Sequence, residues 1–147
     1  MIYRNRMAIA VLSLLGLFVA LYLTLHRVGV IGTLACGADG GCSTVQTSRY
    51  ATFAGVPVPF IGLFGYVLLF GLSMGALRGA LNERKTALAL LVLATIAFAF
   101  SAYLTVLEAV VIHAWCRWCL VSAAIATLIF LCSLPEAARL RRETPEP

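Results

Sequence analysis

Four long apolar stretches, separated by short charged segments, dominate the chain of 147 residues. A helix needs about 20 mostly apolar residues to cross the hydrocarbon core of a bilayer, and each stretch is long enough for one crossing. Proline is disfavoured inside a helix, so Pro57 and Pro59 place the start of the second helix near Phe60. The pattern predicts an all-α membrane protein, a bundle of four transmembrane helices forming one domain, residues 1–147. The expected helices cover about residues 7–25, 60–81, 86–112 and 115–135, and the long connection 26–59 joins the first to the second.

The basic residues are distributed unevenly between the two ends of these helices. Since positive residues gather on the cytoplasmic side of a membrane, the more basic side is expected to be cytoplasmic. This predicts a multi-pass protein of the cell inner (cytoplasmic) membrane, with cytoplasmic termini and an extracytoplasmic loop 26–59. The basic side holds Arg4, Arg6, Arg78, Arg84, Lys85, Arg139, Arg141 and Arg142, and the other side holds Arg27, Arg49 and Arg117.

The composition excludes two broad classes of protein. Hydrophobic residues make up 62% of the chain and charged residues only 12%, which is too apolar for a disordered chain and too poor in charge for a soluble domain. The net charge of +5 would suggest nucleic acid as a partner of a soluble protein. In this chain it indicates membrane orientation instead, and no nucleic-acid partner is expected.

Four of the five cysteines fall on the predicted extracytoplasmic side. Cys36 and Cys42 lie in the long loop, and Cys116 and Cys119 form a Cys-x-x-Cys motif where the fourth helix begins. Extracytoplasmic compartments are those in which disulfides persist. A helix N-terminus and the adjacent Arg117 both favour a thiolate at this motif, and thiolates carry out disulfide exchange. The motif therefore indicates redox chemistry.

Three interpretations of these four cysteines remain open. The pairs can be static disulfides, a four-thiolate site for zinc or another soft metal, or a relay in which the two pairs exchange disulfides. We favour the relay, because a static disulfide has no use for an activated thiol. The alternative function is a non-enzymatic membrane metal-binding or helper subunit with cysteine ligands. Cys132 lies farther along the fourth helix, and we assign it no role.

Together these residues resemble the vitamin K epoxide reductase family, especially its bacterial members that generate disulfides. The shared features are four membrane helices, a cysteine pair in the loop after the first helix, a serine six residues after the second loop cysteine, and an outer Cys-x-x-Cys on the fourth helix. In this sequence they are Cys36, Cys42, Ser48, Cys116 and Cys119.

The resemblance implies a membrane thiol:quinone oxidoreductase that reoxidises an extracytoplasmic thioredoxin-fold disulfide oxidase, with ubiquinone or menaquinone as electron acceptor and no metal. It implies that Cys36 meets the partner protein and that Cys42 exchanges with Cys116. Cys119 would then face the quinone inside the helix bundle. Ser48 would lie near the quinone or the cysteine pair, although a turn or cap hydroxyl is the plainer interpretation of this residue.

The sequence also departs from the family pattern. Vertebrate members carry a tyrosine where this chain has Ala123, and an asparagine near the start of the second helix, whereas no Asn lies between Ser43 and Leu81. These differences favour quinone reduction over epoxide reduction. The chain ends soon after the fourth helix, so we expect a type without a fused thioredoxin domain and a separate partner protein.

Several other residues near the predicted outer face are candidates with two interpretations each. Glu108 is either a proton route to the quinone or an interfacial carboxylate, and we favour the interfacial position. His113 is either a proton acceptor or a solvated side chain. The aromatic residues either line a quinone pocket or sit at the membrane interface. They are Tyr50, Phe53, Phe60, Trp115 and Trp118.

Overall fold

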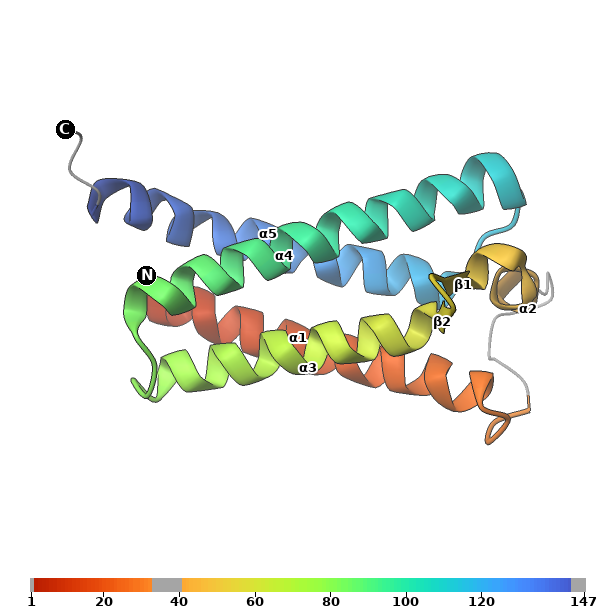
Figure 1. Cartoon of the computed structure of the whole chain (residues 1–147), viewed down its shortest axis with the longest axis horizontal. Helices are drawn as coiled ribbons and strands as arrows, with labels where there is room; N and C mark the ends of the chain where they lie inside the picture. The colour runs from red at the N-terminus through yellow and green to blue at the C-terminus, as the bar shows by residue number, and fades with distance from the viewer. Residues whose placement is uncertain (1, 33–40, 144–147) are drawn as a thin grey trace.

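The protein is a bundle of four long helices, seen here in a computed structural model that describes residues 2–32 and 41–143, with Ser43 described by its backbone only (Figure 1). All four are long and apolar enough to cross a membrane, which confirms the predicted all-α membrane bundle. These helices are α1 (Ile2–Arg27), α3 (Val58–Leu77), α4 (Glu83–Val106), which continues as the π-helical segment η2 (Leu107–Ile112), and α5 (Arg117–Glu143).

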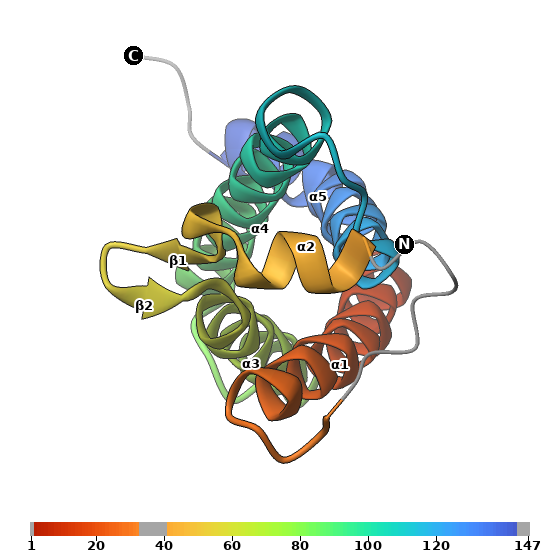
Figure 2. The ribbon, with the colours of Figure 1, turned by 90° about the vertical axis from the view of Figure 1, so that its right-hand side faces the viewer.

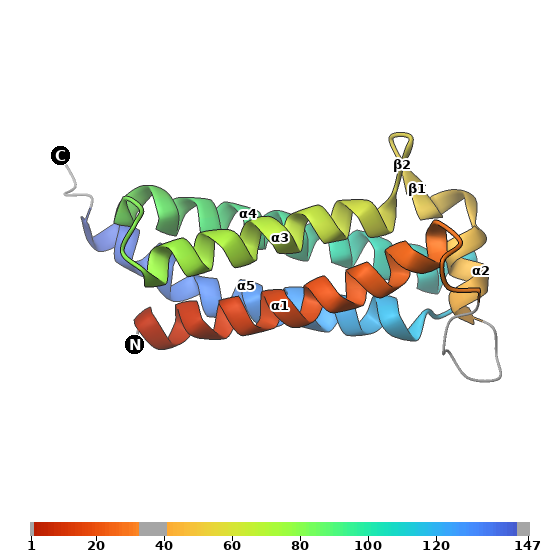
Figure 3. The ribbon, with the colours of Figure 1, turned by 90° about the horizontal axis from the view of Figure 1, so that it is seen from below.

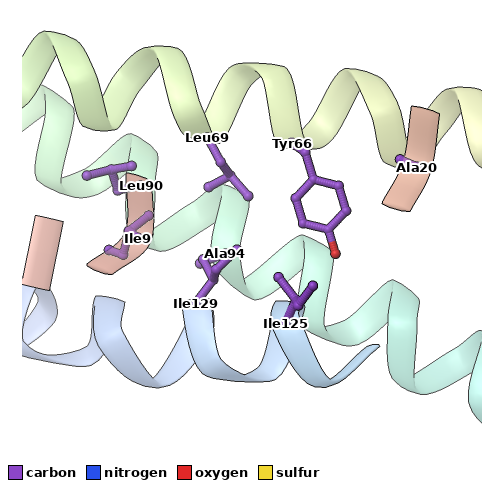
Figure 4. Close-up of a cluster of buried hydrophobic side chains, with 8 residues drawn as sticks. All are labelled: Ile9, Ala20, Tyr66, Leu69, Leu90, Ala94, Ile125 and Ile129. Carbon is purple, nitrogen blue, oxygen red and sulfur yellow. The ribbon is translucent and has the colours of Figure 1, made fainter. Parts of the chain in front are cut away.

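Viewed along its length, the bundle is a ring in the order α1, α3, α4 and α5 (Figure 2). All four helices contribute to one buried apolar cluster along the axis (Figure 4). Buried hydroxyls in the helices are satisfied locally, as where Ser13 and Ser73 donate to the carbonyls of Ile9 and Leu69 at 2.6 and 2.7 Å. Such bonds matter because the bilayer core offers no water to polar groups. The cluster comprises Ile9, Ala20, Tyr66, Leu69, Leu90, Ala94, Ile125 and Ile129.

The connection between α1 and α3 is more ordered than a simple loop. It contains the short helix α2 (Gly41–Thr47), a 3-10 turn η1 (Arg49–Ala51) and the two-residue strands β1 (Thr52–Phe53) and β2 (Val56–Pro57). The strands pair antiparallel, with Phe53 opposite Val56. The turn between them uses positive φ at Ala54 and Gly55, as tight hairpins require. Figure 2 shows α2 lying across the end of the bundle, where it covers the space between the four helices.

The helix boundaries differ from the expected ones for identifiable reasons. The second long helix starts at Val58 rather than near Phe60, because Pro59 lies in its first turn, where proline costs no backbone hydrogen bond. It ends at Leu77, and a turn through Gly79 at φ 68° leads into α4. The fourth long helix begins at Arg117 and continues through Pro135 to Glu143, well past the expected end at residue 135.

Ion pairs hold together the end of the bundle that contains both termini, and they explain why α5 continues so far. Arg6 of α1 is only 4% exposed, and its Nε donates to Glu136 Oε1 of α5 at 2.8 Å. Arg6 also lies 2.9 Å from Glu83 at the start of α4, and Glu83 pairs with Arg139 at 3.0 Å. We call Arg6, Glu83, Glu136 and Arg139 the charged clasp. It joins α1, α4 and α5. Figure 3 shows the start of α1, the start of α4 and the end of α5 at the same end of the bundle.

Candidate active site

At the opposite end, below α2, a cysteine of the connecting segment meets the Cys-x-x-Cys motif. Cys42 of α2 and Cys116, just before α5, are 1% and 0% exposed and share a buried cluster with Val45. Trp118 and Cys119 pack against the same cluster. The structure therefore brings three of the predicted site residues together at one point.

The local backbone makes this approach possible. After the π-helical turn of η2, His113 adopts a left-handed conformation at φ 57°, and the Ala114 N–H donates to the Glu108 carbonyl at 3.2 Å. This ends α4 abruptly and turns the chain into α5. A β-carbon on Gly41 would lie 2.3 Å from the Trp115 carbonyl oxygen, so only glycine lets α2 come this close to the Cys116 segment.

The thiols of the site differ in state and surroundings. Cys42 is engaged in a disulfide, whereas Cys116 and Cys119 are free. The Cys119 backbone N–H donates to Cys116 Sγ at 3.4 Å, and Gln46 Nε2 of α2 donates to Cys119 Sγ, also at 3.4 Å. Hydrogen bonding from the Cys119 side chain lowers the pKa of the Cys116 thiol, against the opposing effect of burial. The arrangement thus favours a Cys116 thiolate, the species that exchanges with disulfides.

Next to the thiol pair lies a cavity of about 420 Å³. This volume falls within the range of about 300–1,000 Å³ that is usual for small-molecule sites. Its walls come mostly from apolar side chains of the four long helices and the connecting segment, and Cys119 is part of the lining. The cavity therefore suits an apolar molecule that must meet a thiol. Its polar lining includes Gln46, Ser48, Tyr66, Glu108 and Ser122.

Some of the site residues predicted from the sequence lie in the cysteine cluster and some line the cavity. Others lie in neither place. Ser48, Tyr50 and Phe53 all line the cavity. Phe60 does not appear in the cavity lining of the described chain and is 36% exposed. Cys36 lies outside the described residues.

Ser48 has features of both interpretations offered for it. The residue lines the cavity, and its hydroxyl donates to the Val45 carbonyl at 2.8 Å. It is therefore a turn hydroxyl placed at the cavity wall.

The remaining residues considered from the sequence are not part of the described cavity lining. Trp115 is 54% exposed, and Trp118 packs against Tyr22 with ring centroids 5.0 Å apart. His113 is exposed. Cys132 packs against the central apolar cluster, far along α5 from the motif. These placements fit interfacial or packing positions for all four residues.

The sequence analysis gave too little weight to Glu108 and did not identify Gln46, and both residues lie at the site. Glu108 is only 3% exposed, and its Oε2 accepts a hydrogen bond from the Cys116 N–H at 3.1 Å, so it is buried beside the thiol pair. Gln46 was not considered at all. Its position four residues after Cys42 places both on one face of a helix, which is the signal that could have found it.

Within residues 2–32 and 41–143, no group of three or more His, Cys, Asp or Glu side chains is arranged to hold a metal ion.

A four-helix membrane bundle in which one thiol of a free pair lines an apolar cavity is suited to a membrane thiol oxidoreductase. The chain belongs to the vitamin K epoxide reductase family, whose family model matches residues 7–134, which is most of its length. Proteins of this family are membrane oxidoreductases of thiols and disulfides. They use quinones as electron partners and work with thioredoxin-like proteins.

Proposed function

We propose that the protein is a membrane thiol:quinone oxidoreductase that reoxidises an extracytoplasmic thioredoxin-fold disulfide donor. One observation carries this proposal. Cys116 shares a buried cluster with Cys42 of α2, whereas Cys119, three residues on, also lines the apolar cavity. The two thiols of one motif therefore face different environments, one toward the connecting segment and one toward a space that suits a lipid-soluble molecule.

The proposed route passes through two cysteine pairs. Cys36 exchanges with the partner protein, Cys42 exchanges with Cys116, and Cys119 delivers the electrons inside the bundle. Each transfer is an attack of a thiolate on a disulfide through a mixed disulfide. The lowered pKa of Cys116 supports its role as the exchanging thiol. The oxidised Cys42 and free Cys116 and Cys119 correspond to the stage before electrons leave the motif.

The cavity residues fit a quinone chemically. Gln46 is 5% exposed and lines the cavity, and its Oε1 has no hydrogen-bond partner within the described chain. A buried acceptor without a partner favours a ligand that carries a donor, as the hydroxyls of a reduced quinone do. A bound quinone would supply a two-electron acceptor. Ser48, Tyr50, Phe53 and Cys119 would contact it, with the aromatic rings beside its apolar ring.

The direct test is quinone reduction by purified protein in detergent. Protein whose thiols are reduced with dithiothreitol should reduce a short-chain ubiquinone or menaquinone, monitored by the absorbance of the quinone. Cys119→Ala should reduce none, and Cys132→Ala should match the unmodified chain. An unmodified protein that leaves the quinone oxidised would contradict the proposed reaction.

A second measurement distinguishes this function from a metal-binding role. Purified protein is denatured, alkylated and analysed by mass spectrometry, and its metal content is measured in parallel. The proposed enzyme should contain disulfides and no stoichiometric metal. Free thiols with stoichiometric zinc or copper would favour the metal-binding alternative.

We also propose the inner membrane as location, with cytoplasmic termini and an extracytoplasmic α2. The asymmetry of the basic residues supports this orientation. In a chain without its natural cysteines, Val30→Cys should react with an impermeant maleimide added to intact spheroplasts. Leu81→Cys, in the α3–α4 turn, should react only after lysis. Val30 and Leu81 are 71% and 42% exposed, so both probes are accessible. The opposite labelling would invert the orientation.

A further inference from the structure

Glu108 is an ionisable residue buried at the thiol site without a cationic partner. It is 3% exposed and lies within a helix long and apolar enough to span the membrane. Among the described residues it takes part in no ion pair, and the cavity beside it has no Lys, Arg or His in its described lining. Burying a carboxyl group without a cation is costly, so a structure retains one mainly where function needs it.

The contacts of Glu108 point to the cysteine pair. Its Oε2 accepts from the Cys116 backbone N–H at 3.1 Å, and the Cys119 side chain is a hydrogen-bonding neighbour of the same carboxyl group. The titratable groups that interact with it are the thiols of Cys116 and Cys119, the same cavity is also lined by Tyr50 and Tyr66, and α2 contributes only the uncharged Val45 and Gln46 to it. Glu108 therefore has one oxygen held by the backbone while its carboxyl group lies beside the thiol at the cavity wall.

Glu108 also ends a polar stripe along the cavity. Ser101, Thr105 and Glu108 follow one another at intervals of four and three residues, which places them on one face of the helix, and all three line the cavity. The π-helical segment begins at Leu107, immediately before Glu108. Such segments are rare and frequently occur at functional sites.

We propose that Glu108 is the proton-transfer residue of the cysteine pair: its carboxylate takes the proton of the Cys119 thiol and passes it to a quinone oxygen. This inference rests on the proposed function. In the overall step the Cys116 thiolate and the Cys119 thiol form a disulfide and lose two electrons and one proton. The quinone gains both electrons and two protons and becomes hydroquinone. Glu108 passes on the proton of Cys119 and is regenerated as the carboxylate, and the second proton comes from water, to which Cys116 released it on becoming a thiolate, so the step is balanced.

Two substitutions separate proton transfer from a positioning role. Glu108→Gln keeps an oxygen that can accept from the Cys116 N–H but removes the carboxyl proton acceptor. Glu108→Asp keeps the carboxyl group on a shorter side chain. If Glu108 transfers protons, single-turnover quinone reduction should fall by about 10²-fold or more in the Gln variant and much less in the Asp variant. If Glu108 only holds the Cys116 segment, the Gln variant should be at least as fast as Asp, and that order would overturn the proposal.

The pH profile gives a second criterion. In the Gln variant the Cys119 proton must go to hydroxide, so the rate should rise about tenfold per pH unit and approach that of the unmodified protein at high pH. A Gln profile parallel to that of the unmodified protein would contradict proton transfer by Glu108. The matched control is Glu143→Gln, the same change at the far end of α5, where Glu143 pairs with Arg139 at 3.0 Å. It should leave rate and profile unchanged.

A further test uses the unmodified protein, so it does not require that a variant folds correctly. Infrared difference spectra during quinone reduction should show a protonated carboxyl group that appears and then disappears. Absence of this signal from protein that does reduce quinone would overturn the role of Glu108 alone. Failure of the unmodified protein to reduce quinone would overturn both proposals. Quinone binding, followed by tryptophan fluorescence, should be the same for the unmodified protein and Glu108→Gln, and a lost affinity would instead make Glu108 a binding residue.

Discussion

The two ends of the bundle, at the left and right of Figure 1, each bury an acidic side chain, but the partners of that side chain differ between the ends. In the charged clasp, Glu136 is 1% exposed and is held by both Nε and Nη2 of Arg6, at 2.8 and 3.2 Å. At the α2 end, Glu108 is equally buried, yet its described partners are a backbone N–H and a thiol. A buried carboxylate that is paired with a cation, as Glu136 is, joins helices together. A buried carboxylate that has no cationic partner and lies against reactive thiols, as Glu108 does, is available for chemistry.

The backbone shows the same contrast. At the clasp end, the α3–α4 turn is closed by Asn82, whose side chain accepts from the Lys85 N–H at 3.3 Å, and α5 runs on regularly to Glu143. At the α2 end, α4 passes into a π-helical turn and His113 adopts positive φ. Strained conformations of this kind persist where the surroundings fix them, often at functional sites. We infer that one end supplies stability and the other chemistry.

The strongest test of this division is Cys119→Ala. It should abolish quinone reduction, because the thiol at the cavity is gone. It should also trap a Cys42–Cys116 disulfide, because the thiol that normally attacks this link is missing. Peptide mapping under non-reducing conditions would identify the link.

Two outcomes would change the proposed route. A Cys36–Cys116 link in the Cys119→Ala variant would reverse the roles of the two loop cysteines. If neither link forms, the two pairs do not exchange. Cys116→Ala serves as the control, since it removes the acceptor sulfur and should trap neither link.

At the clasp end, Glu136→Gln should lower stability and spare the chemistry. Removing one partner of a buried ion pair typically costs about 3–5 kcal/mol, and Arg6 retains Glu83, so we expect the lower part of this range. Thermal unfolding in detergent measures the loss. Glu143→Gln breaks an exposed pair with Arg139 and should cost less than about 1 kcal/mol.

This prediction has a clear counter-result. The folded Glu136→Gln protein should reduce quinone at the unmodified rate at a temperature well below its melting point. A rate that falls in the folded state would mean that the clasp takes part in the chemistry, and the proposed division between the two ends would then be wrong.

The close approach of α2 to the Cys116 segment can be tested by a small change at Gly41. Gly41→Ala places a β-carbon 2.3 Å from the Trp115 carbonyl, so α2 must shift away. A displacement of about 1 Å at a reacting pair can slow a reaction about 10²-fold, so exchange between Cys42 and Cys116 should slow by roughly 10–100-fold. Stopped-flow mixing with a reduced thioredoxin-fold protein measures it. Gly71→Ala, with no neighbour within 4 Å of its β-carbon, should exchange normally. Equal rates for the two variants would show that the glycine contact does not position the thiols.

The features that the sequence predicts correctly are those that depend on composition and on the spacing of nearby residues. The four helices follow from their apolar length, and the family follows from the cysteine and serine pattern together. The burial of Glu108 could not be predicted from the sequence, because an acidic residue near the end of an apolar stretch usually reaches water. In the folded chain Glu108 is buried within the π-helical segment η2, and α2 packs against that segment.

The charged clasp could not be predicted from the sequence either, because its residues lie far apart along the chain. Arg6 and Glu136 are separated by 130 positions, and the sequence showed Arg6 only as one of several basic residues that set the orientation. Pairing over such a distance is a property of the fold. The same holds for Gln46, whose contact with Cys119 spans 73 positions.

The smallest expected effect concerns Ser48, where a turn hydroxyl lies at the cavity wall. Ser48→Ala removes its 2.8 Å hydrogen bond to the Val45 carbonyl and one polar group from the cavity. A net hydrogen bond is worth about 1 kcal/mol, so quinone reduction should slow roughly fivefold if the hydroxyl also contacts the quinone, while thiol exchange with the partner protein stays near normal. Thr127→Ala is the matched control, since its hydroxyl makes the same 2.8 Å bond to the Ala123 carbonyl on α5 but is not part of the described cavity lining. Comparing quinone and thiol rates for both variants isolates the cavity contribution from the loss of a backbone contact. If Ser48→Ala behaves like Thr127→Ala in both assays, Ser48 belongs with the structural hydroxyls of the bundle, and the chemistry of the α2 end is confined to the cysteines and Glu108.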